Sequence, residues 1–146
     1  MIYVAGSSQE IERAEKWAAA LRQEKIDVTS NWPENIREVQ RKIKAPTTLD
    51  AANPKRATVA DRRGWAQVNV DQVRRSESLW LLIPGAGITS QGAYYELAIA
   101  NENGKRTIGS GGDQRFIFAA LSTMLYETDE EAFEALRIIH QPAMAL

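Results

Sequence analysis

The sequence predicts an α/β fold with a mostly parallel sheet, and three observations support this prediction. Short apolar, β-prone runs alternate with segments of helical periodicity. Residues 79–83 form an unbroken apolar run bounded by Pro84 and Gly85, which is typical of a strand buried on both faces of a parallel sheet. Glycines follow several of the predicted strands, where tight turns lead into helices. We expect residues 1–146 to form one domain, because about 100–200 residues typically make a domain.

The N-terminal part begins with a strand, a turn and a helix. Residues 2–5 are β-prone and end at Gly6-Ser7-Ser8, and apolar residues then recur at helical spacing over residues 9–23. A second strand is predicted at residues 26–29, before a turn at residues 30–33.

The middle of the chain is less regular. Residues 34–44 are weakly helical, and residues 45–56 are rich in turn formers, which indicates a loop that is either mobile or functional. A helix is predicted over residues 57–76, with four apolar contacts at Trp65, Val68, Val70 and Val73.

The C-terminal half continues the alternation of strands and helices around a central strand at residues 79–83. Helices are predicted at residues 90–103 and around residues 116–125, with a strand at residues 106–109 between them. A capping box at residues 128–131 predicts a last helix over residues 132–139.

Composition and charge exclude several kinds of site. The 146 residues include 18 Lys and Arg, 19 Asp and Glu, one His and no Cys, for a net charge of −1. Without cysteine there is no disulfide, Fe–S cluster, thiolate zinc site or cysteine nucleophile, and we expect a cytoplasmic protein with no metal and no cofactor. The near-neutral charge argues against a nucleic-acid partner. No apolar run approaches the roughly 18 residues of a membrane span, so we expect no membrane partner.

Known catalytic motifs are also absent. The lone histidine, His140, removes Ser-His-Asp catalysis unless it is itself the base. Gly85-Ala86-Gly87 followed by Ser90 does not fit the GxGxxG dinucleotide pattern, and no GxxxxGK[ST] motif occurs. Any chemistry must therefore use carboxylates, hydroxyls, amides and tyrosine.

The carboxyl ends of the predicted strands should meet around one cleft, where ligands bind in such sheets. Residues 6–7, 84–90 and 109–112 would surround it. If Ser90 is the N-cap of its helix, its hydroxyl and the free N–H groups of the next two residues, Gln91 and Gly92, form an anion site. The alternative is a serine that only caps a helix.

Two carboxylates are candidates for catalysis. Glu96 leans back over Gly92 and Ala93, an open shelf at the cleft, and its apolar neighbours would make an idle carboxylate costly. The alternative is an ordinary surface glutamate. Asp71 falls near the end of the preceding helix. A pair of carboxylates suits cleavage of a glycosidic bond.

Three stretches carry a family resemblance: Ile2-Tyr3-Val4-Ala5-Gly6-Ser7, Asp71 before Ser76-Glu77-Ser78-Leu79, and Ser90 and Gly92 to Glu96-Leu97 with Gly104-Lys105. In this order they resemble the nucleoside 2-deoxyribosyltransferase family, which includes the 2'-deoxynucleoside 5'-phosphate N-hydrolases. The resemblance covers residues 1–8 and 68–109. It implies a flavodoxin-like, Rossmann-like three-layer α/β domain, in a homodimer or higher oligomer whose neighbouring subunit completes each site.

The resemblance also implies an activity and a role for each matching residue. The expected reaction is cleavage or base exchange at the N-glycosidic bond of a (deoxy)nucleoside or its 5'-monophosphate. Glu96 would attack the anomeric carbon and form a covalent glycosyl-enzyme, and Asp71 would assist the departing base or the nucleophile. Tyr3 would hydrogen-bond the carboxylate or the sugar, while Gly6 and Ser7 would approach the substrate closely.

Position 90 favours a 5'-monophosphate within this family. Members that act on free nucleosides typically carry Asp there, and a serine at a helix N-terminus does not repel a phosphate as Asp would. Gln9 stands where the hydrolases carry a phosphate-binding arginine, and Phe118 falls near the position of a neighbouring subunit's serine. Trp32 either stacks on the base or belongs to the packing of the fold.

Two other functions remain open from the sequence. A TIR-like NAD glycohydrolase also uses a glutamate on a flavodoxin-like layer, and base release from NAD would distinguish it. A nucleotide-binding sensor would keep the cleft without the chemistry, and ligand would stabilise it without turnover.

Overall fold

A parallel sheet forms the middle layer of the molecule. The computed structural model describes residues 1–51, 53 and 57–140. Its strands lie side by side in the order β1 (Ile2–Ala5), β2 (Ser78–Leu82), β3 (Arg106–Ser110) and β4 (Met124–Tyr126), and each neighbouring pair is parallel. Val28 adds a parallel bridge to Ile2 on the outer side of β1. With Val28 counted as the second position along the chain, the order is that of a doubly wound sheet.

The strand predicted at residues 26–29 is reduced to this single bridge. The reason lies in the hydrogen bonds along the outer edge of β1. Farther along its outer edge, the Val4 N–H donates to the Ser30 hydroxyl at 3.0 Å, and the Val4 carbonyl accepts from the Trp32 indole N–H at 2.9 Å. Two side chains therefore satisfy the backbone groups that a longer strand would have paired.

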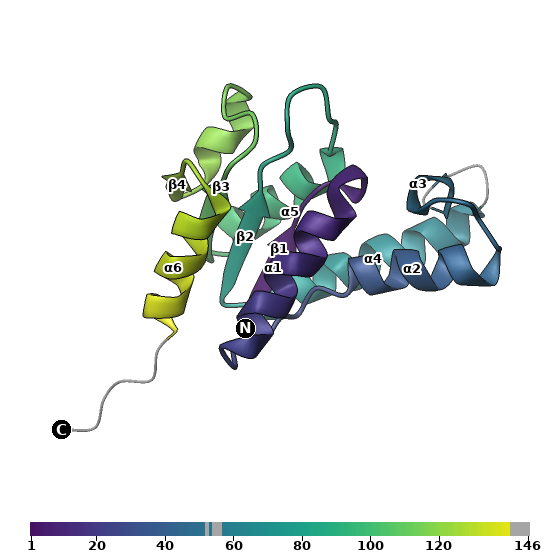
Figure 1. Cartoon of the computed structure of the whole chain (residues 1–146), viewed down its shortest axis with the longest axis horizontal. Coiled ribbons are helices and arrows are strands. Elements are labelled where there is room, and N and C mark those ends of the chain that lie inside the picture. Colours follow the sequence, from purple (N-terminus) through teal and green to yellow (C-terminus); the bar gives the residue numbers. More distant parts are fainter. Residues whose placement is uncertain (52, 54–56, 141–146) are drawn as a thin grey trace.

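Helices cover both faces of the sheet (Figure 1). The helices α1 (Ile11–Gln23) and α6 (Asp129–Ile139) lie in front of it, and α5 (Gln91–Glu102) lies behind it. A short 3-10 helix, η1 (Ser8–Glu10), leads into α1. The sequence predicted each of these helices within two residues at the N-terminal end, except α6, which begins at Asp129 because Thr128 caps it. None of the described helices is both long and apolar enough to cross a membrane.

The core is centred on β2, whose five residues are all buried, as the apolar run predicted. Trp80 on this strand contacts Trp17 of α1, with 5.5 Å between ring centroids, and Trp17 contacts Phe133 of α6 at the same distance. The Trp80 indole N–H donates to the Ser110 hydroxyl on β3 at 2.9 Å. These contacts join the front helices to the middle of the sheet.

Three further helices extend to one side of the sheet (Figure 1): α2 (Trp32–Lys42), α3 (Thr48–Ala51) and the N-terminal half of α4 (Val59–Arg75). This position corrects the contacts predicted for α4. Val73 is buried, but Trp65 and Val68 are exposed, because the first half of α4 lies beyond the edge of the sheet.

The prediction of a helix around residues 116–125 is wrong. The chain forms a 3-10 helix, η3 (Ile117–Leu121), and then β4, which pairs with β3 at the edge of the sheet. The apolar pattern of this stretch does not indicate a helix, because residues such as Phe116, Ile117 and Phe118 are exposed instead of lying on one buried helix face.

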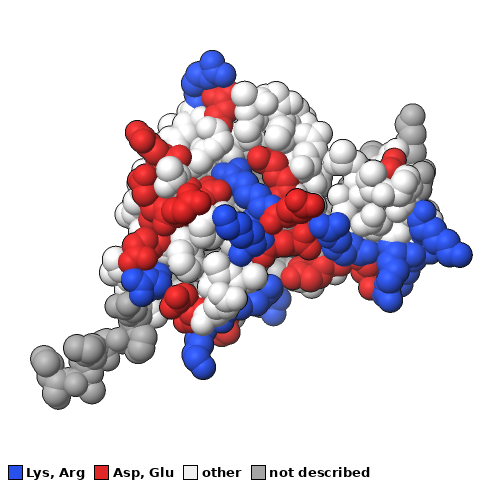
Figure 2. Space-filling model, viewed as in Figure 1, with Lys and Arg blue, Asp and Glu red and all other residues white. Residues whose placement is uncertain are grey.

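Acidic and basic side chains are interspersed over the face that carries α1 and α6 (Figure 2). No continuous basic surface is visible on this face.

Candidate functional site

A cavity of about 410 Å³ lies at the carboxyl end of β1, between α5 and the side helices. One side is built from small and polar residues that follow β1 or begin α5. The opposite side is built from α2, α3 and α4. The residues lining it are Gly6, Ser8, Trp32, Asn35, Ile36, Val39, Ala51, Arg62, Trp65, Asn69, Thr89, Ser90, Gln91, Gly92, Ala93 and Glu96. Five predicted site residues therefore meet here: Gly6, Trp32, Ser90, Gly92 and Glu96.

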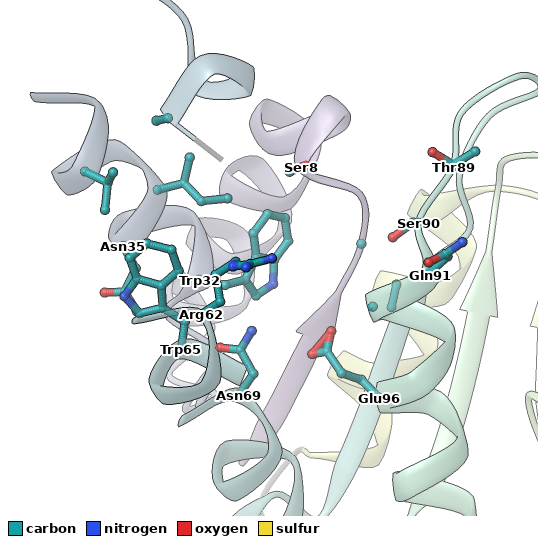
Figure 3. Close-up of a pocket in the computed structure, with 16 residues that line it drawn as sticks. Ser8, Trp32, Asn35, Arg62, Trp65, Asn69, Thr89, Ser90, Gln91 and Glu96 are labelled. Atoms are coloured by element: carbon teal, nitrogen blue, oxygen red, sulfur yellow. The ribbon is translucent and has the colours of Figure 1, made fainter. Parts of the chain in front are cut away.

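Glu96 extends from the second turn of α5 into this cavity (Figure 3). The residue is 8% exposed, so the carboxylate is almost wholly removed from bulk water. Gly92 lies one turn earlier, and a Cβ added there would meet nothing within 4 Å. The open shelf that the sequence predicted beside Glu96 is therefore present.

Burial and Tyr3 set the charge state of Glu96. Burial raises the pKa of the Glu96 carboxyl to about 7, although the nearby Tyr3 hydroxyl opposes part of this rise. Burial and the charge of Glu96 in turn raise the pKa of Tyr3 far above its usual value. The Tyr3 hydroxyl is close enough to Glu96 to act on its charge, but the two do not reach full hydrogen-bond geometry, and neither the Tyr3 hydroxyl nor Glu96 Oε2 has another hydrogen-bond partner among the described residues. A buried carboxylate thus keeps an oxygen without a hydrogen-bond partner, which is typical of functional sites.

The N-terminus of α5 supplies the neighbouring polar wall. Ser90 occupies the N-cap position, but its hydroxyl makes no capping hydrogen bond. The simple capping role that the sequence left open for Ser90 is therefore not seen, and its hydroxyl faces the cavity with the first N–H groups of the helix. This end of the helix favours negative charge.

Ser7, which the resemblance brings close to the substrate, does not line the cavity. Ser7 is buried outside the cavity lining, where its hydroxyl donates to the Thr89 carbonyl and accepts from the Gln9 N–H, both at 3.2 Å. The first of these bonds joins the turn after β1 to the loop before α5. Ser8 is the serine that lines the cavity.

Asp71 does not lie in this cavity. Its carboxylate is exposed and accepts a hydrogen bond from Gln67 Nε2 at 3.0 Å. Asn69, two residues earlier on α4, lines the cavity instead. Residues two apart on a helix point in nearly opposite directions, so the two cannot both face Glu96. The catalytic role of Asp71 stays a prediction.

The far side of the cavity carries the side chains that sequence reasoning missed. Asn35 follows Trp32 on α2, and Arg62, Trp65 and Asn69 recur along one face of α4. We call Trp32, Asn35, Arg62, Trp65 and Asn69 the α2–α4 wall. The spacing of 62, 65 and 69 is itself a helical stripe, and it could have been recognised had Trp65 not been assigned to the core.

Arg62 is the positive charge that the sequence did not locate. Its guanidinium makes no ion pair or hydrogen bond with any other described residue. Within the described part of the chain, no three His, Asp or Glu side chains lie close enough together to hold a metal ion.

The comparisons with known proteins support the architecture. No family model and no curated protein matches this chain. Among solved structures, it is similar to the CMP N-glycosidase BcmB of Clostridium botulinum, with a TM-score of 0.53 and 16% identity over 94% of this chain and 98% of that one. The fold is flavodoxin-like. The three-layer α/β class expected from the sequence is thereby confirmed, with a sheet in which all described neighbours are parallel.

Proposed function

We propose that this protein cleaves the N-glycosidic bond of a nucleoside 5'-monophosphate. The observation that carries the proposal is Glu96, a buried carboxylate that extends into a cavity, with Tyr3 behind it and an open glycine shelf beside it. The similar structure is a nucleotide N-glycosidase, which supports glycosidic chemistry on this architecture.

The two sides of the cavity suit the two ends of a nucleotide. The sugar would lie on the shelf at Gly92, next to Glu96. Its 5'-phosphate would accept hydrogen bonds from the Ser90 hydroxyl and the free N–H groups at the start of α5. The base would then extend toward the indoles of Trp32 and Trp65, which provide stacking surface.

Glu96 would act as the nucleophile. Its carboxylate attacks the anomeric carbon as the bond to the base breaks, which gives a covalent glycosyl-Glu96 intermediate. Water then attacks the same carbon and frees Glu96, or a second base does so and completes an exchange. The Tyr3 hydroxyl, which has no partner among the described residues, would donate a hydrogen bond to the carboxylate or to the sugar.

We also propose that two or more copies of the chain associate through an apolar face beside α5. Tyr95 and Ile117 are 65% and 73% exposed, and Phe116, Phe118, Leu121 and Leu125 are exposed as well. Tyr94 contacts Phe116 and Phe116 contacts Phe118, both edge to face, with 4.7 and 5.5 Å between ring centroids. A contiguous apolar face of this kind marks an interaction surface. A second cavity at this face shares Thr89, Ser90 and Gln91 with the first, so a partner copy would lie next to the site.

Base release is the experiment that tests the reaction. The protein is incubated with ribo- and deoxynucleosides, their 5'-monophosphates and NAD, with and without an acceptor base, and free base is followed by chromatography. We expect release from a 5'-monophosphate, and a loss of about 1000-fold or more in Glu96→Gln. Release from NAD alone would favour the NAD glycohydrolase, and ligand-induced stabilisation without turnover would favour a sensor.

A matched pair of glycine variants tests the position of the substrate. Gly92→Leu would fill the shelf, whereas Gly64→Leu adds the same side chain to open space on α4, outside the cavity lining. We expect Gly92→Leu to raise KM at least tenfold and Gly64→Leu to leave it unchanged. Equal effects from both would contradict the proposed binding mode.

A further inference from the structure

Arg62 is placed to act on the base as it departs. Among the described residues, it is the one cation that lines the cavity, and Glu96 is the one carboxylate. Figure 3 shows Arg62 with Trp32, Trp65 and Asn69 on one side of Glu96, and Ser90 and Gln91 on the other. Because the start of α5 takes the phosphate in the proposed function, the α2–α4 wall faces the base. This inference rests on that proposed function.

Breaking an N-glycosidic bond leaves an electron pair on the base, and a site can stabilise it in two ways. An acid can protonate a ring nitrogen remote from the bond, as departure of a purine requires. Alternatively, hydrogen-bond donors can stabilise negative charge on a carbonyl next to the glycosidic nitrogen. Only bases with an oxo group beside that nitrogen, the 2-oxopyrimidines, offer the second route.

The residues that line the cavity suit the second route, in which hydrogen-bond donors stabilise negative charge on a carbonyl of the base. Besides Glu96, no carboxyl group, histidine, lysine or tyrosine lines it among the described residues. Asp71, the other carboxylate expected from the sequence, is outside it and bonded to Gln67. The polar groups of the α2–α4 wall are the Arg62 guanidinium, which has five N–H donors and no pairing partner in the described chain, and the amides of Asn35 and Asn69.

We propose that Arg62 stabilises a departing 2-oxopyrimidine as its anion. The C1'–N1 bond breaks as the bond between C1' and a Glu96 oxygen forms. The electron pair passes to N1 and is shared with O2, which accepts hydrogen bonds from Arg62. The base anion then takes a proton from solvent, and water attacks C1' to release the sugar and restore the carboxylate. Arg62 is thus a catalytic residue that selects pyrimidine over purine nucleotides.

The test measures kcat and KM for cytidine, uridine, adenosine and guanosine 5'-monophosphates, in the ribo and 2'-deoxy forms. We expect pyrimidine nucleotides to be cleaved at least 100-fold faster than purine nucleotides. Arg62→Gln is expected to lower kcat on pyrimidines about 100-fold, the effect of removing one donor to developing charge. Arg63→Gln, at the neighbouring exposed position outside the cavity lining, is the matched control and should not change kcat.

A leaving-group series separates a catalytic role from a structural one. A 5-fluoropyrimidine departs more easily as an anion, so the loss caused by Arg62→Gln should shrink at least fivefold when a 5-fluorouracil nucleotide replaces its uracil counterpart. A structural defect would reduce both rates equally and would overturn the proposal.

Two other results would also overturn it. One is purine cleavage by the unmodified protein at a rate equal to or above that of pyrimidines. The other is an Arg62→Gln variant in which only the KM for phosphorylated substrates rises, while nucleosides are cleaved as before, since Arg62 would then bind the phosphate. Both results still require base release that depends on Glu96, so they leave the proposed function intact. Absence of base release from every nucleotide would defeat the proposed function itself, and this inference with it.

Discussion

At the scale of single residues, Glu96 meets two opposing requirements. As the nucleophile of the proposed reaction it would have to be ionised, but its burial favours the protonated form and raises its pKa to about 7. The Tyr3 hydroxyl opposes the rise, which keeps a substantial ionised fraction at neutral pH. Without Tyr3, the buried Glu96 carboxyl would be more fully protonated at neutral pH.

The pH dependence of cleavage should report this pair. We expect kcat/KM to rise as pH increases through about 7, because only ionised Glu96 attacks. Tyr3→Phe removes the group that lowers the pKa of Glu96, so the rising limb should move to higher pH, with a loss of about tenfold in kcat. Tyr95→Phe, on the exposed side of α5, is the control. An unchanged limb in Tyr3→Phe would contradict the role of Tyr3.

Glu96 should also weaken the ligand-free fold at high pH. Its native pKa of about 7 exceeds its ordinary value of 4.5, so the native state binds more protons between these values and stability falls as pH rises through them. Glu96→Gln avoids this cost, and we expect it to raise the free energy of unfolding by about 3 kcal/mol at pH 8, at about 1.4 kcal/mol per pKa unit. Urea unfolding should show little gain at pH 4.5, and an equal gain at both pH values would refute the explanation.

At the scale of elements, the turn after β3 is the most constrained segment. Gly112 has φ +62°, and a Cβ added there would overlap the Ile83 carbonyl oxygen. Gly104, just after α5, has a similar φ of +68° but open space around it. We expect Gly104→Ala to cost about 1 kcal/mol for its left-handed backbone, and Gly112→Ala to cost at least about 3 kcal/mol more because the backbone must move. Thermal unfolding of both variants measures the difference.

An ion pair ties the front helices to the ends of two strands. Arg13 of α1 donates to both carboxylate oxygens of Asp129, at 2.7 and 2.8 Å, and also to the carbonyls of Ile83 and Ser110. Burial alone would raise the pKa of Asp129, but hydrogen bonds from Arg13, Ser110 and Trp17 and the charge of Arg13 lower it.

Asp129→Asn should therefore cost about 3 kcal/mol at neutral pH, because it leaves a half-buried arginine without its partner. Since the native pKa of Asp129 is depressed, its contribution is present above the ordinary value of 3.8 and disappears as pH falls below it. The deficit of the variant should consequently shrink at pH 3. Glu130→Gln, exposed on the same turn of α6, is the control, and an equal deficit in both variants would count against the network.

The elements also show how far a sequence predicts such a molecule. Residues 79–83 were recognisable as the central strand because burial on both faces leaves an unbroken apolar run. Glu96 and its shelf followed from helical geometry within a single element. The exposed position of Asp71 and the α4 residues of the α2–α4 wall could not be predicted in this way, because they depend on how α4 is rotated against the rest of the fold. The helix prediction for residues 116–125 failed for a related reason. Several apolar side chains of this stretch are exposed, so they do not mark a buried helix face.

At the scale of the whole molecule, self-association can be tested at the apolar face beside α5. We expect light scattering to give at least twice the 16.3 kDa chain mass. Ile117→Glu introduces a charge on this face and should give monomers, whereas Ile138→Glu, at an exposed position on α6, should not. Base release should fall with dissociation, because the face adjoins Ser90. A monomeric unmodified protein would rule out the proposed assembly.

The two sides of the cavity are supplied by different parts of the fold. Glu96, Tyr3 and Ser90 belong to the sheet and to the helix packed on it, whereas the α2–α4 wall belongs to helices that lie beyond the edge of the sheet (Figure 1). In the proposed function, changes at Arg62 or Trp65 in the first half of α4 would alter the chosen base without disturbing the core or Glu96. Trp32 of α2, in contrast, is also part of the core and donates to the Val4 carbonyl. If Glu96 and the α2–α4 wall act as proposed, a division of this kind would let substrate preference diverge in evolution while the reaction is kept.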